Sequence, residues 1–303
     1  MFNLIFVVLP LITSLIHLPS VNAGIWKPKA GTTWNWSLGQ NPNKLPLVAG
    51  EYDVIDIDLY DVTKETIKEM HDLGLKVICY FSAGTYEPFR KENKGMLDVK
   101  GLVRTKMKDW DEYWLDVRVE GIKPFMISAL DVAKEKGCDG AEFDNVDGYS
   151  NVKWDDKFTA QDQIKYNSWL AEKAHERGIA AGLKNSVGLL KDLVDKFDFA
   201  INEQCSDYNE CKAYTIFLDQ NKPVFTALYG LETSKTFMSK VCSAVGTLDL
   251  SVIIKDPSQD LKYPYTRFNY DTFCGRKRKY RNTTTKTKKI RTVNSKSPRN
   301  WDY

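Results

Sequence analysis

Four carboxylates lie within nine residues near the middle of the chain. If residues 140–145 form a strand, Glu142 and Asp144 point to the same face, because side chains alternate along a strand. Two acids on one face of a buried strand cost free energy unless a site uses them. A further acid, Glu203, ends another apolar run. Carboxylates at the ends of two strands suit glycoside hydrolysis; an ion-pair cluster or a calcium site is the alternative interpretation.

The elements that must position these acids follow from the alternation of apolar runs and helical patterns. Helical patterns cover residues 63–73, 124–136, 160–177, 189–197, 212–220 and 235–246. Strands are predicted at 52–59, 76–82, 114–118, 140–145, 179–185, 199–203, 223–229 and 251–255. Eight strands with helical segments between them predict an α/β fold, a single (β/α)8 TIM barrel. An open doubly wound sheet is disfavoured because no glycine-rich phosphate loop follows the first strand.

Functional groups of such barrels lie at the carboxyl ends of the strands. That rule selects a set of polar residues here, namely Asp58, Ser82, Asp116, Asp144, Asn145, Lys184, Asn185, Glu203, Tyr229 and Asp256. So many polar residues at one recurring position favour a functional site over chance.

The acids receive different predicted roles. Asp144 is predicted as the nucleophile or charge-stabilising carboxylate, and Glu142, on the same face, is its main rival. Close like charges would push the two pKa values apart, so that one acid stays ionised while the other holds a proton. Glu203 is predicted as the general acid/base. An ion pair with Lys184 is the alternative for Glu203, and both readings can hold because a lysine neighbour tunes an acid.

Further polar residues are predicted to bind the sugar. They are Asp58, Tyr80, Asp116, Glu142, Asn145, Lys184 and Tyr229. A structural hydrogen-bonding role is the alternative for each. Four aromatic residues, Trp34, Trp36, Tyr86 and Trp110, are weaker candidates for stacking on sugar faces, because aromatic side chains are more often part of a core.

The first 23 residues are predicted to be a signal peptide, because residues 2–18 are mostly apolar and Ala23 is a small residue suited to cleavage. An uncleaved anchor is the alternative, and Pro10 and Pro19 argue against it. The predicted organisation is therefore a signal peptide at 1–23, a barrel domain at 24–275 and a basic, disordered tail at 276–303. Such a protein is expected to be secreted, extracellular and monomeric, with no membrane contact after cleavage.

The tail has its own charge pattern. Residues 276–299 hold eleven Lys or Arg and no acid, and without these eleven and Asp302 the chain has 32 basic and 39 acidic residues. The body is thus acidic, although the whole chain has a net charge of +3. A nucleic-acid role is one interpretation of such a tail. For a secreted protein we expect no nucleic-acid partner and a solvated tail or a tether to an anionic matrix instead.

The six cysteines form an even set behind a predicted signal peptide, which indicates disulfides, although six allow fifteen connectivities. Cys205 and Cys211 are near enough in sequence to close a small loop. Cys242 can be joined to Cys274, which leaves Cys79 for Cys138. A zinc site is disfavoured because no CxxC pair exists, and neither a metal nor an organic cofactor is expected. Two glycosylation sequons occur, at Asn35 and Asn282, of which the second is favoured.

Several segments in this order and spacing resemble glycoside hydrolase family 114. They are residues 26–36, 53–59, 77–90, 114–118, 137–149, 182–185, 202–205 and 222–225, so the resemblance covers roughly residues 25 to 275. It implies a secreted TIM barrel with endo-α-1,4-polygalactosaminidase activity, whose two proposed catalytic acids map onto Asp144 and Glu203. Two positions depart from the family pattern: Ala129 stands where an arginine is usual, and Leu228-Tyr229 where a Glu-Tyr pair is usual.

The sequence therefore predicts a secreted, endo-acting hydrolase of α-1,4-linked galactosamine-containing polysaccharide. The acidic body favours a cationic, deacetylated polymer. Two alternatives stay open. One is a hydrolase of another amino-sugar glycan, and the other is a catalytically silent carbohydrate-binding barrel in which the change at Leu228 has dismantled the site. Retention or inversion of the anomeric carbon depends on the separation of the two carboxylates.

Overall fold

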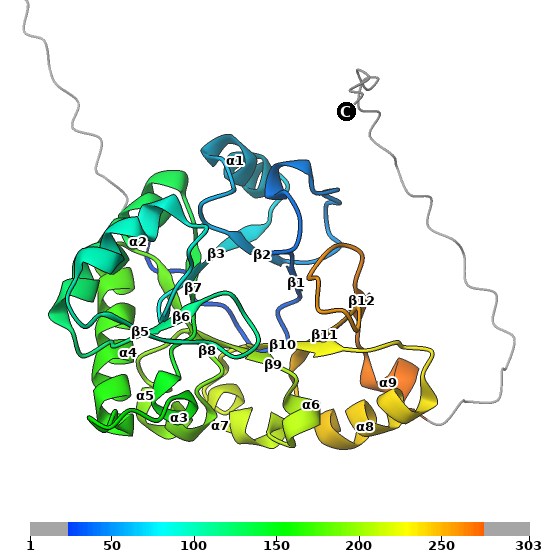
Figure 1. The fold of residues 1–303 in the computed structure, drawn as a ribbon. Coiled ribbons are helices and arrows are strands. Elements are labelled where there is room, and N and C mark those ends of the chain that lie inside the picture. The colour runs from blue at the N-terminus through cyan, green and yellow to red at the C-terminus, as the bar shows by residue number, and fades with distance from the viewer. Residues whose placement is uncertain (1–23, 276–303) are drawn as a thin grey trace, which may run out of the picture.

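The computed structural model describes residues 24–275, and its centre is one curled, mainly parallel sheet (Figure 1). Eight parallel strands follow one another in the order β1 (Trp34–Trp36), β2 (Val54–Asp58), β3 (Lys76–Ser82), β7 (Gly140–Asp144), β8 (Ala180–Lys184), β9 (Phe199–Glu203), β10 (Val224–Tyr229) and β11 (Ser251–Lys255). A short antiparallel strand, β12 (Thr266–Arg267), pairs with β11. The predicted signal peptide and basic tail lie outside the described residues.

Helices cover the outer face of this sheet (Figure 1). The α-helices are α1 (Lys64–Asp72), α2 (Lys123–Lys136), α3 (Gly148–Asn151), α4 (Ala160–His175), α5 (Leu190–Leu193), α6 (Cys205–Tyr208), α7 (Thr215–Leu218), α8 (Lys235–Val245) and α9 (Tyr270–Phe273). The 3-10 helices are η1 (Pro42–Lys44), η2 (Lys91–Asp98), η3 (Glu120–Ile122), η4 (Val187–Leu189) and η5 (Cys211–Tyr214).

Local sequence signals account for several helix ends. Thr63 caps α1 by accepting a hydrogen bond from the backbone nitrogen of Thr66. Gly137 ends α2 in the left-handed conformation, with φ of 93°, which a glycine adopts without strain. Thr159 and Asp162 form a reciprocal capping box at the start of α4.

The two edge strands of the parallel run, β1 and β11, are joined by side chains. The indole nitrogen of Trp34 donates to the carbonyl of Ser251 over 2.7 Å, and the Ser251 hydroxyl donates to the carbonyl of Thr32 over 2.6 Å. The sheet thereby curls into a barrel, and the predicted (β/α)8 class is confirmed.

The barrel interior changes character along the strands. An apolar cluster, which includes Phe199, Ile201, Phe225 and Ala227, fills the part nearer the amino ends of β9 and β10. Because side chains alternate, the next inward position along β9 is Glu203 and along β10 is Tyr229. The side chains that point into the barrel are thus apolar near the amino ends of these strands and polar at their carboxyl ends.

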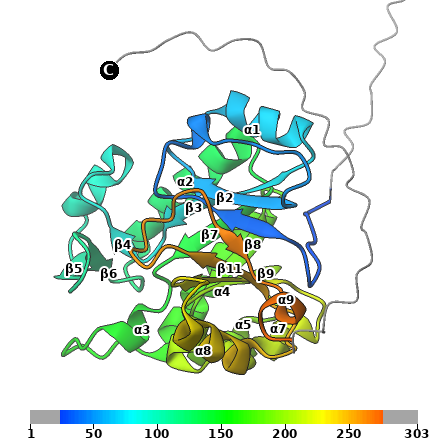
Figure 2. The same ribbon diagram turned by 90° about the vertical axis from the view of Figure 1, so that its right-hand side faces the viewer.

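One predicted barrel strand is wrong. Residues 114–118 contribute only β6 (Tyr113–Leu115), which pairs antiparallel with β4 (Thr85–Tyr86) and β5 (Val103–Lys106) in a separate three-stranded sheet. Figure 2 shows this sheet to one side of the barrel. We call residues 83–122, which leave the barrel after β3 and return at α2, the hairpin insertion. The eighth barrel strand is instead β1, which was not predicted. Its three residues are all buried, and it is too short to show an alternating pattern.

The three predicted disulfides are all present. Cys79 pairs with Cys138, Cys205 with Cys211, and Cys242 with Cys274. The first joins β3 to the residues that precede β7, the second closes the turn after β9, and the third ties α8 to the end of α9.

Removing the Cys79–Cys138 bridge should destabilise the protein more than removing the Cys205–Cys211 bridge. The two bridges span sequence separations of 59 and 6 residues. The entropy of loop closure in the unfolded chain then gives about 4 kcal/mol for the long loop and about 2 kcal/mol for the short one. Urea denaturation of the two double Cys→Ala variants measures both losses. A larger loss for the short-loop variant would contradict this account.

Two further findings concern the surface. Asn35 lies in β1 and is fully buried, so the sequon at Asn35 has no room for a glycan in the folded protein; Asn282 lies outside the described residues. Across residues 24–275, no helix is both long and apolar enough to cross a membrane.

Candidate active site

A cavity of about 430 Å³ lies at the carboxyl ends of the barrel strands. Its lining comes from the strand ends, from the hairpin insertion and from the segment after β11: Trp36, Leu38, Gly39, Asp58, Tyr80, Glu87, Phe89, Arg90, Met107, Trp110, Glu112, Asp144, Asn145, Lys184, Asn185, Glu203, Tyr229, Gln259, Asp260 and Leu261. Another cavity, of about 460 Å³, lies between β1, β11 and α9. We place the active site in the first cavity, because acids from several barrel strands converge there, whereas no acid of a barrel strand lines the second among residues 24–275.

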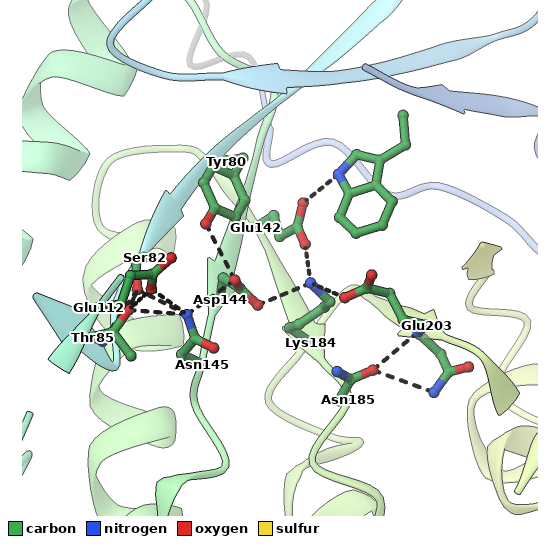
Figure 3. Close-up of polar contacts among 12 residues, drawn as sticks. Tyr80, Ser82, Thr85, Glu112, Glu142, Asp144, Asn145, Lys184, Asn185 and Glu203 are labelled. Carbon is green, nitrogen blue, oxygen red and sulfur yellow. Dashed lines mark hydrogen bonds and ion pairs between the residues drawn. The ribbon is translucent and has the colours of Figure 1, made fainter. Parts of the chain in front are cut away.

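Lys184, at the end of β8, is the centre of the site. Its Nζ atom lies 3.0 Å from Glu142 Oε1, 2.9 Å from Asp144 Oδ1 and 3.1 Å from Glu203 Oε2 (Figure 3). Burial disfavours the charged form of this lysine, but the three carboxylates outweigh burial and raise its pKa well above the ordinary value. Lys184 therefore carries a positive charge that holds three acids from different strands together.

Glu142 belongs to the floor of the site and not to its surface. Its side chain is 0% exposed, and its Oε2 atom accepts a hydrogen bond from the indole nitrogen of Trp36 over 3.0 Å. Burial raises the pKa of Glu142, while the cation of Lys184 opposes that rise. Of the two rival acids on β7, Asp144 is the one that lines the cavity, with a side chain that is 19% exposed.

Asp56 lies beneath this floor and was missed by sequence reasoning. It is fully buried, and neither of its carboxyl oxygens accepts a hydrogen bond from a donor in residues 24–275. Burial, followed by the neighbouring Glu142 carboxylate, raises the pKa of Asp56 well above its ordinary value. The neutral form of Asp56 is therefore favoured over the charged form.

Both carboxylate oxygens of Asp144 are engaged. Lys184 contacts Oδ1, while Oδ2 accepts hydrogen bonds from the Tyr80 hydroxyl at 3.2 Å and from the Asn145 amide at 3.1 Å. Asn145 stands directly after β7 with φ of 61°, a left-handed conformation that asparagine tolerates better than most residues. The turn is packed tightly, since a Cβ atom on Gly84 would lie 1.7 Å from the Asn145 carbonyl oxygen.

Glu203 is held in a similar way at the end of β9. Lys184 contacts its Oε2 atom, and the Tyr229 hydroxyl donates to its Oε1 atom. Burial, followed by the negative charge of Glu203, raises the pKa of Tyr229, so this phenol keeps its proton and remains a donor. The Glu203 side chain is 27% exposed and lines the cavity.

A second group of charges, from outside the barrel strands, lines the same cavity. Arg90, in the hairpin insertion, contacts Asp58 Oδ2, and its Nε atom lies 3.5 Å from Glu87 Oε2. Burial raises the pKa of Glu87 to about 8. Glu112 also belongs to this group. Sequence reasoning did not select Glu87, Arg90 or Glu112 as site residues, because they lie in irregular segments and not at predicted strand ends. Glu87 and Arg90 do belong to the segment 77–90 that resembles the family.

Asp116 is placed away from the cavity, and this corrects its predicted position at a barrel strand end. Its carboxylate is nearly buried and contacts Arg104 at 3.0 Å and Arg118 at 2.7 Å. Both arginines also contact Asp156. Asp116 therefore belongs to an ion-pair cluster that supports the hairpin insertion.

The aromatic candidates separate into two kinds. Trp34, Trp36 and Tyr86 are buried, so Trp36 meets the cavity only as a packed wall beside Lys184. Trp110 lines the cavity and is 59% exposed. Phe89, which was not predicted, lines it as well and is 68% exposed. These last two are the side chains suited to stacking on a sugar ring.

The sequence profile of glycoside-hydrolase family GH114 matches residues 16–271. The chain belongs to this family. The predicted resemblance is thus confirmed, and the protein is a glycoside hydrolase. No curated protein matches the sequence significantly.

Two solved structures illustrate the GH114 relationship. Ega3 of Aspergillus fumigatus, crystallised in complex with galactosamine, is 33% identical in sequence. Its alignment covers 81% of this chain and 98% of Ega3, with a TM-score of 0.72. The glycoside hydrolase domain of PelA from Pseudomonas aeruginosa is 12% identical; its alignment covers 78% of this chain and 97% of that domain, with a TM-score of 0.59, and it supports the fold alone.

Proposed function

We propose that this protein is a secreted, endo-acting hydrolase of α-1,4-linked galactosamine-containing polysaccharide, with Asp144 as nucleophile and Glu203 as general acid/base. The observation that carries the proposal is the pair of accessible carboxylates held by Lys184 at the mouth of the barrel. Its substrate class rests on membership of GH114 and on likeness to Ega3, which was crystallised with galactosamine.

The proposed reaction has two steps. The reaction starts when the Glu203 carboxylate takes up a proton from solvent, while Asp144 stays ionised. In the first step, an Asp144 oxygen attacks the anomeric carbon while Glu203 gives this proton to the departing glycosidic oxygen, so that a glycosyl-enzyme forms. In the second, Glu203 removes a proton from water, and the water oxygen displaces Asp144 from the anomeric carbon. Glu203 ends protonated and Asp144 ionised, which restores the starting state.

The chain's other groups keep the two acids apart and in place. Lys184 lies between Asp144 and Glu203 and contacts one oxygen of each. Tyr80 and Tyr229 then orient the remaining oxygen of each acid by donating a hydrogen bond. In this proposal Glu142 acts through Lys184, since its own carboxylate does not line the cavity.

We predict hydrolysis with retention of the anomeric configuration. Because one Lys184 nitrogen contacts Asp144 Oδ1 at 2.9 Å and Glu203 Oε2 at 3.1 Å, these two oxygens are no farther apart than the sum of those distances. Two facing oxygens within this limit fit the roughly 5–5.5 Å carboxyl separation of retaining enzymes better than the wider separations that admit a water molecule in inverting enzymes. Proton NMR spectra recorded in the first minutes of hydrolysis should show the α-anomer of the new reducing end. Initial appearance of the β-anomer would contradict the assignment of Asp144 as nucleophile.

The position of Leu228 argues against a catalytically silent barrel. Leu228 is fully buried and packs with Val241 of α8 and with the Cys205–Cys211 bridge, on the outer side of β10. Tyr229, the next residue, is the one that lines the cavity. Leucine at position 228 therefore removes no carboxylate from the cavity.

Secretion is supported by two independent features. The first is the predicted signal peptide at residues 1–23. The second is the set of three disulfides, which persist in oxidising compartments.

The size of the products tests the endo-acting part of the proposal. Purified protein is incubated with α-1,4-galactosaminan, and the soluble products are analysed by mass spectrometry at low conversion. A ladder of oligosaccharides is expected. Release of monosaccharide alone would contradict endo-cleavage.

A further inference from the structure

The active-site cavity holds more acids than cations. Six carboxyl-bearing residues line it, namely Asp58, Glu87, Glu112, Asp144, Glu203 and Asp260, against Arg90 and Lys184 as the lining cations. An excess of acids in a cleft focuses a negative potential there and attracts cationic ligands. A lining acid that has no lysine, arginine or histidine within ion-pair distance would be the one free to bind such a ligand.

Within the described residues, a protein cation lies beside five of the six acids. Lys184 contacts Asp144 and Glu203, as described above. Arg90 contacts Asp58 and lies near Glu87, and Asp260 contacts the exposed Lys262. In residues 24–275, no lysine, arginine or histidine forms an ion pair with Glu112, whose partners are neutral.

The Glu112 carboxyl group is held in position but forms no ion pair within the described residues. Burial raises its pKa, and the hydrogen bond from Thr85 opposes that rise. Its Oε2 atom accepts hydrogen bonds from the Thr85 hydroxyl and, at 3.5 Å, from the Asn145 amide. Its Oε1 atom accepts no hydrogen bond from a donor in the described part of the chain. Thr85 and Asn145 thus hold one oxygen of Glu112 in place, while the other is free to accept from a ligand in the cavity.

The neighbouring Glu87 differs from Glu112 in having a cation beside it, since Arg90 Nε lies 3.5 Å from Glu87 Oε2. Glu87 is only 2% exposed, and it accepts no hydrogen bond from a donor in residues 24–275. With a pKa of about 8, Glu87 carries a proton at neutral pH. Glu87 can therefore donate a hydrogen bond to a sugar oxygen. Glu112 is the acid of the cavity wall that is placed to bind a cationic group.

Glu112 lies one side chain away from the predicted nucleophile. The Asn145 amide nitrogen is 3.1 Å from Asp144 Oδ2 and 3.5 Å from Glu112 Oε2. In Figure 3, Glu112 and Glu203 lie on opposite sides of Asp144. A group bound by Glu112 would therefore sit on the sugar that is cleaved or on its immediate neighbour, on the side away from the general acid/base.

Aromatic side chains at the rim complete a subsite. Trp110 lies two residues before Glu112, and Phe89 lies two residues after Glu87; both are exposed and line the cavity. An aromatic face stacks on the apolar face of a pyranose, which leaves ring substituents free to reach a carboxylate beside it. The hairpin insertion thus supplies both the acid and the platforms.

We propose that Glu112 is a specificity-determining residue that binds the ammonium group of a 2-amino sugar next to the cleaved bond. The inference rests on the proposed function and deepens it, because it names the chain's own selector for deacetylated residues. N-acetylation removes the positive charge and the charged hydrogen bond, so acetylated residues gain nothing from Glu112.

The first test measures the binding of monosaccharides, which the enzyme cannot cleave. Dissociation constants for galactosamine and N-acetylgalactosamine are measured by NMR titration with wild-type protein, Glu112→Gln and the control Asp111→Asn. Asp111 is the neighbouring acid in the hairpin insertion, is exposed and pairs with Lys106, so its loss removes one charge without touching the cavity.

Glu112→Gln should weaken galactosamine binding about tenfold or more and change N-acetylgalactosamine binding less than about twofold, since a hydrogen bond to a charged group contributes about 1.5–3 kcal/mol. Asp111→Asn should change neither. Equal binding of galactosamine by wild-type and Glu112→Gln proteins would overturn the inference. So would an equal loss in Asp111→Asn, because the effect would then be one of overall charge.

Kinetics separate this inference from the proposed function. On polymer, Glu112→Gln should lose kcat/KM for fully deacetylated galactosaminan and not for partly acetylated material. If the wild-type protein cleaves neither polymer, the proposed function fails, while Glu112-dependent binding of galactosamine still supports amine recognition. If the wild-type protein cleaves the polymer and Glu112→Gln keeps the same preference, the inference fails and the proposed function stands.

Discussion

Asp144→Asn and Glu203→Gln should each lower kcat/KM for galactosaminan by about 10²–10⁴-fold or more. Each substitution keeps the shape of the side chain and removes the charge or proton that the reaction needs. Both side chains are partly exposed and line the cavity, so the fold should tolerate the change. Initial rates of reducing-end release, with circular dichroism spectra to check folding, measure the effect.

Asp256→Asn is the matched control for these two variants. Asp256 follows β11 at the same end of the barrel, yet it is exposed and does not line the cavity. Within the described part of the chain, its carboxylate accepts a hydrogen bond only from the backbone nitrogen of Ser258. It should keep wild-type activity. Turnover close to wild type in Asp144→Asn or Glu203→Gln would remove that residue from the mechanism.

Lys184→Met should lower the stability by about 3–5 kcal/mol at neutral pH and also abolish activity. The lysine is the cation shared by Glu142, Asp144 and Glu203, and its side chain is 3% exposed. Methionine fills a similar volume without charge, so it leaves three acids facing one another. Urea denaturation curves at pH 5 and pH 8 measure the loss of free energy of unfolding.

The loss should grow with pH. Burial already raises the pKa of Glu142, and Lys184 opposes that rise, so removal of the lysine raises the pKa further above its unfolded value. The folded variant then binds more protons than the unfolded chain, and its stability falls as pH increases through the folded pKa. Adding Glu142→Gln to Lys184→Met should recover part of the stability at pH 8. A deficit independent of pH would argue that lost packing, and not charge, is responsible.

The barrel could be predicted from sequence where strands are long enough to show a pattern. The bounds of β3, β9 and β11 match their predicted ranges, and paired cysteines follow from an even count behind a predicted signal peptide. β1 was missed because three buried residues carry no periodicity, and its tryptophans were read as sugar-stacking groups. The alternating residues around Trp114 belong to a sheet outside the barrel, which the pattern alone does not distinguish.

The inner part of the site was predictable because its residues lie on strands that are long enough to show a pattern. A strand-end rule brings Asp144, Lys184, Glu203 and Tyr229 together wherever their strands are correctly assigned. It misplaced Asp116 because its strand is not in the barrel. Glu112 was beyond reach, because long-range folding of the hairpin insertion, and not local sequence, brings it to the cavity.

The central claim is tested most directly by reducing-end release from a panel of polysaccharides. Purified residues 24–303 are assayed on α-1,4-galactosaminan, on its fully N-acetylated form and on the β-1,4-linked amino-sugar polymer chitosan. The account predicts rapid release from galactosaminan, weak release from the acetylated polymer and none from chitosan. Release from chitosan but not from galactosaminan, or release from none of the three, would contradict it.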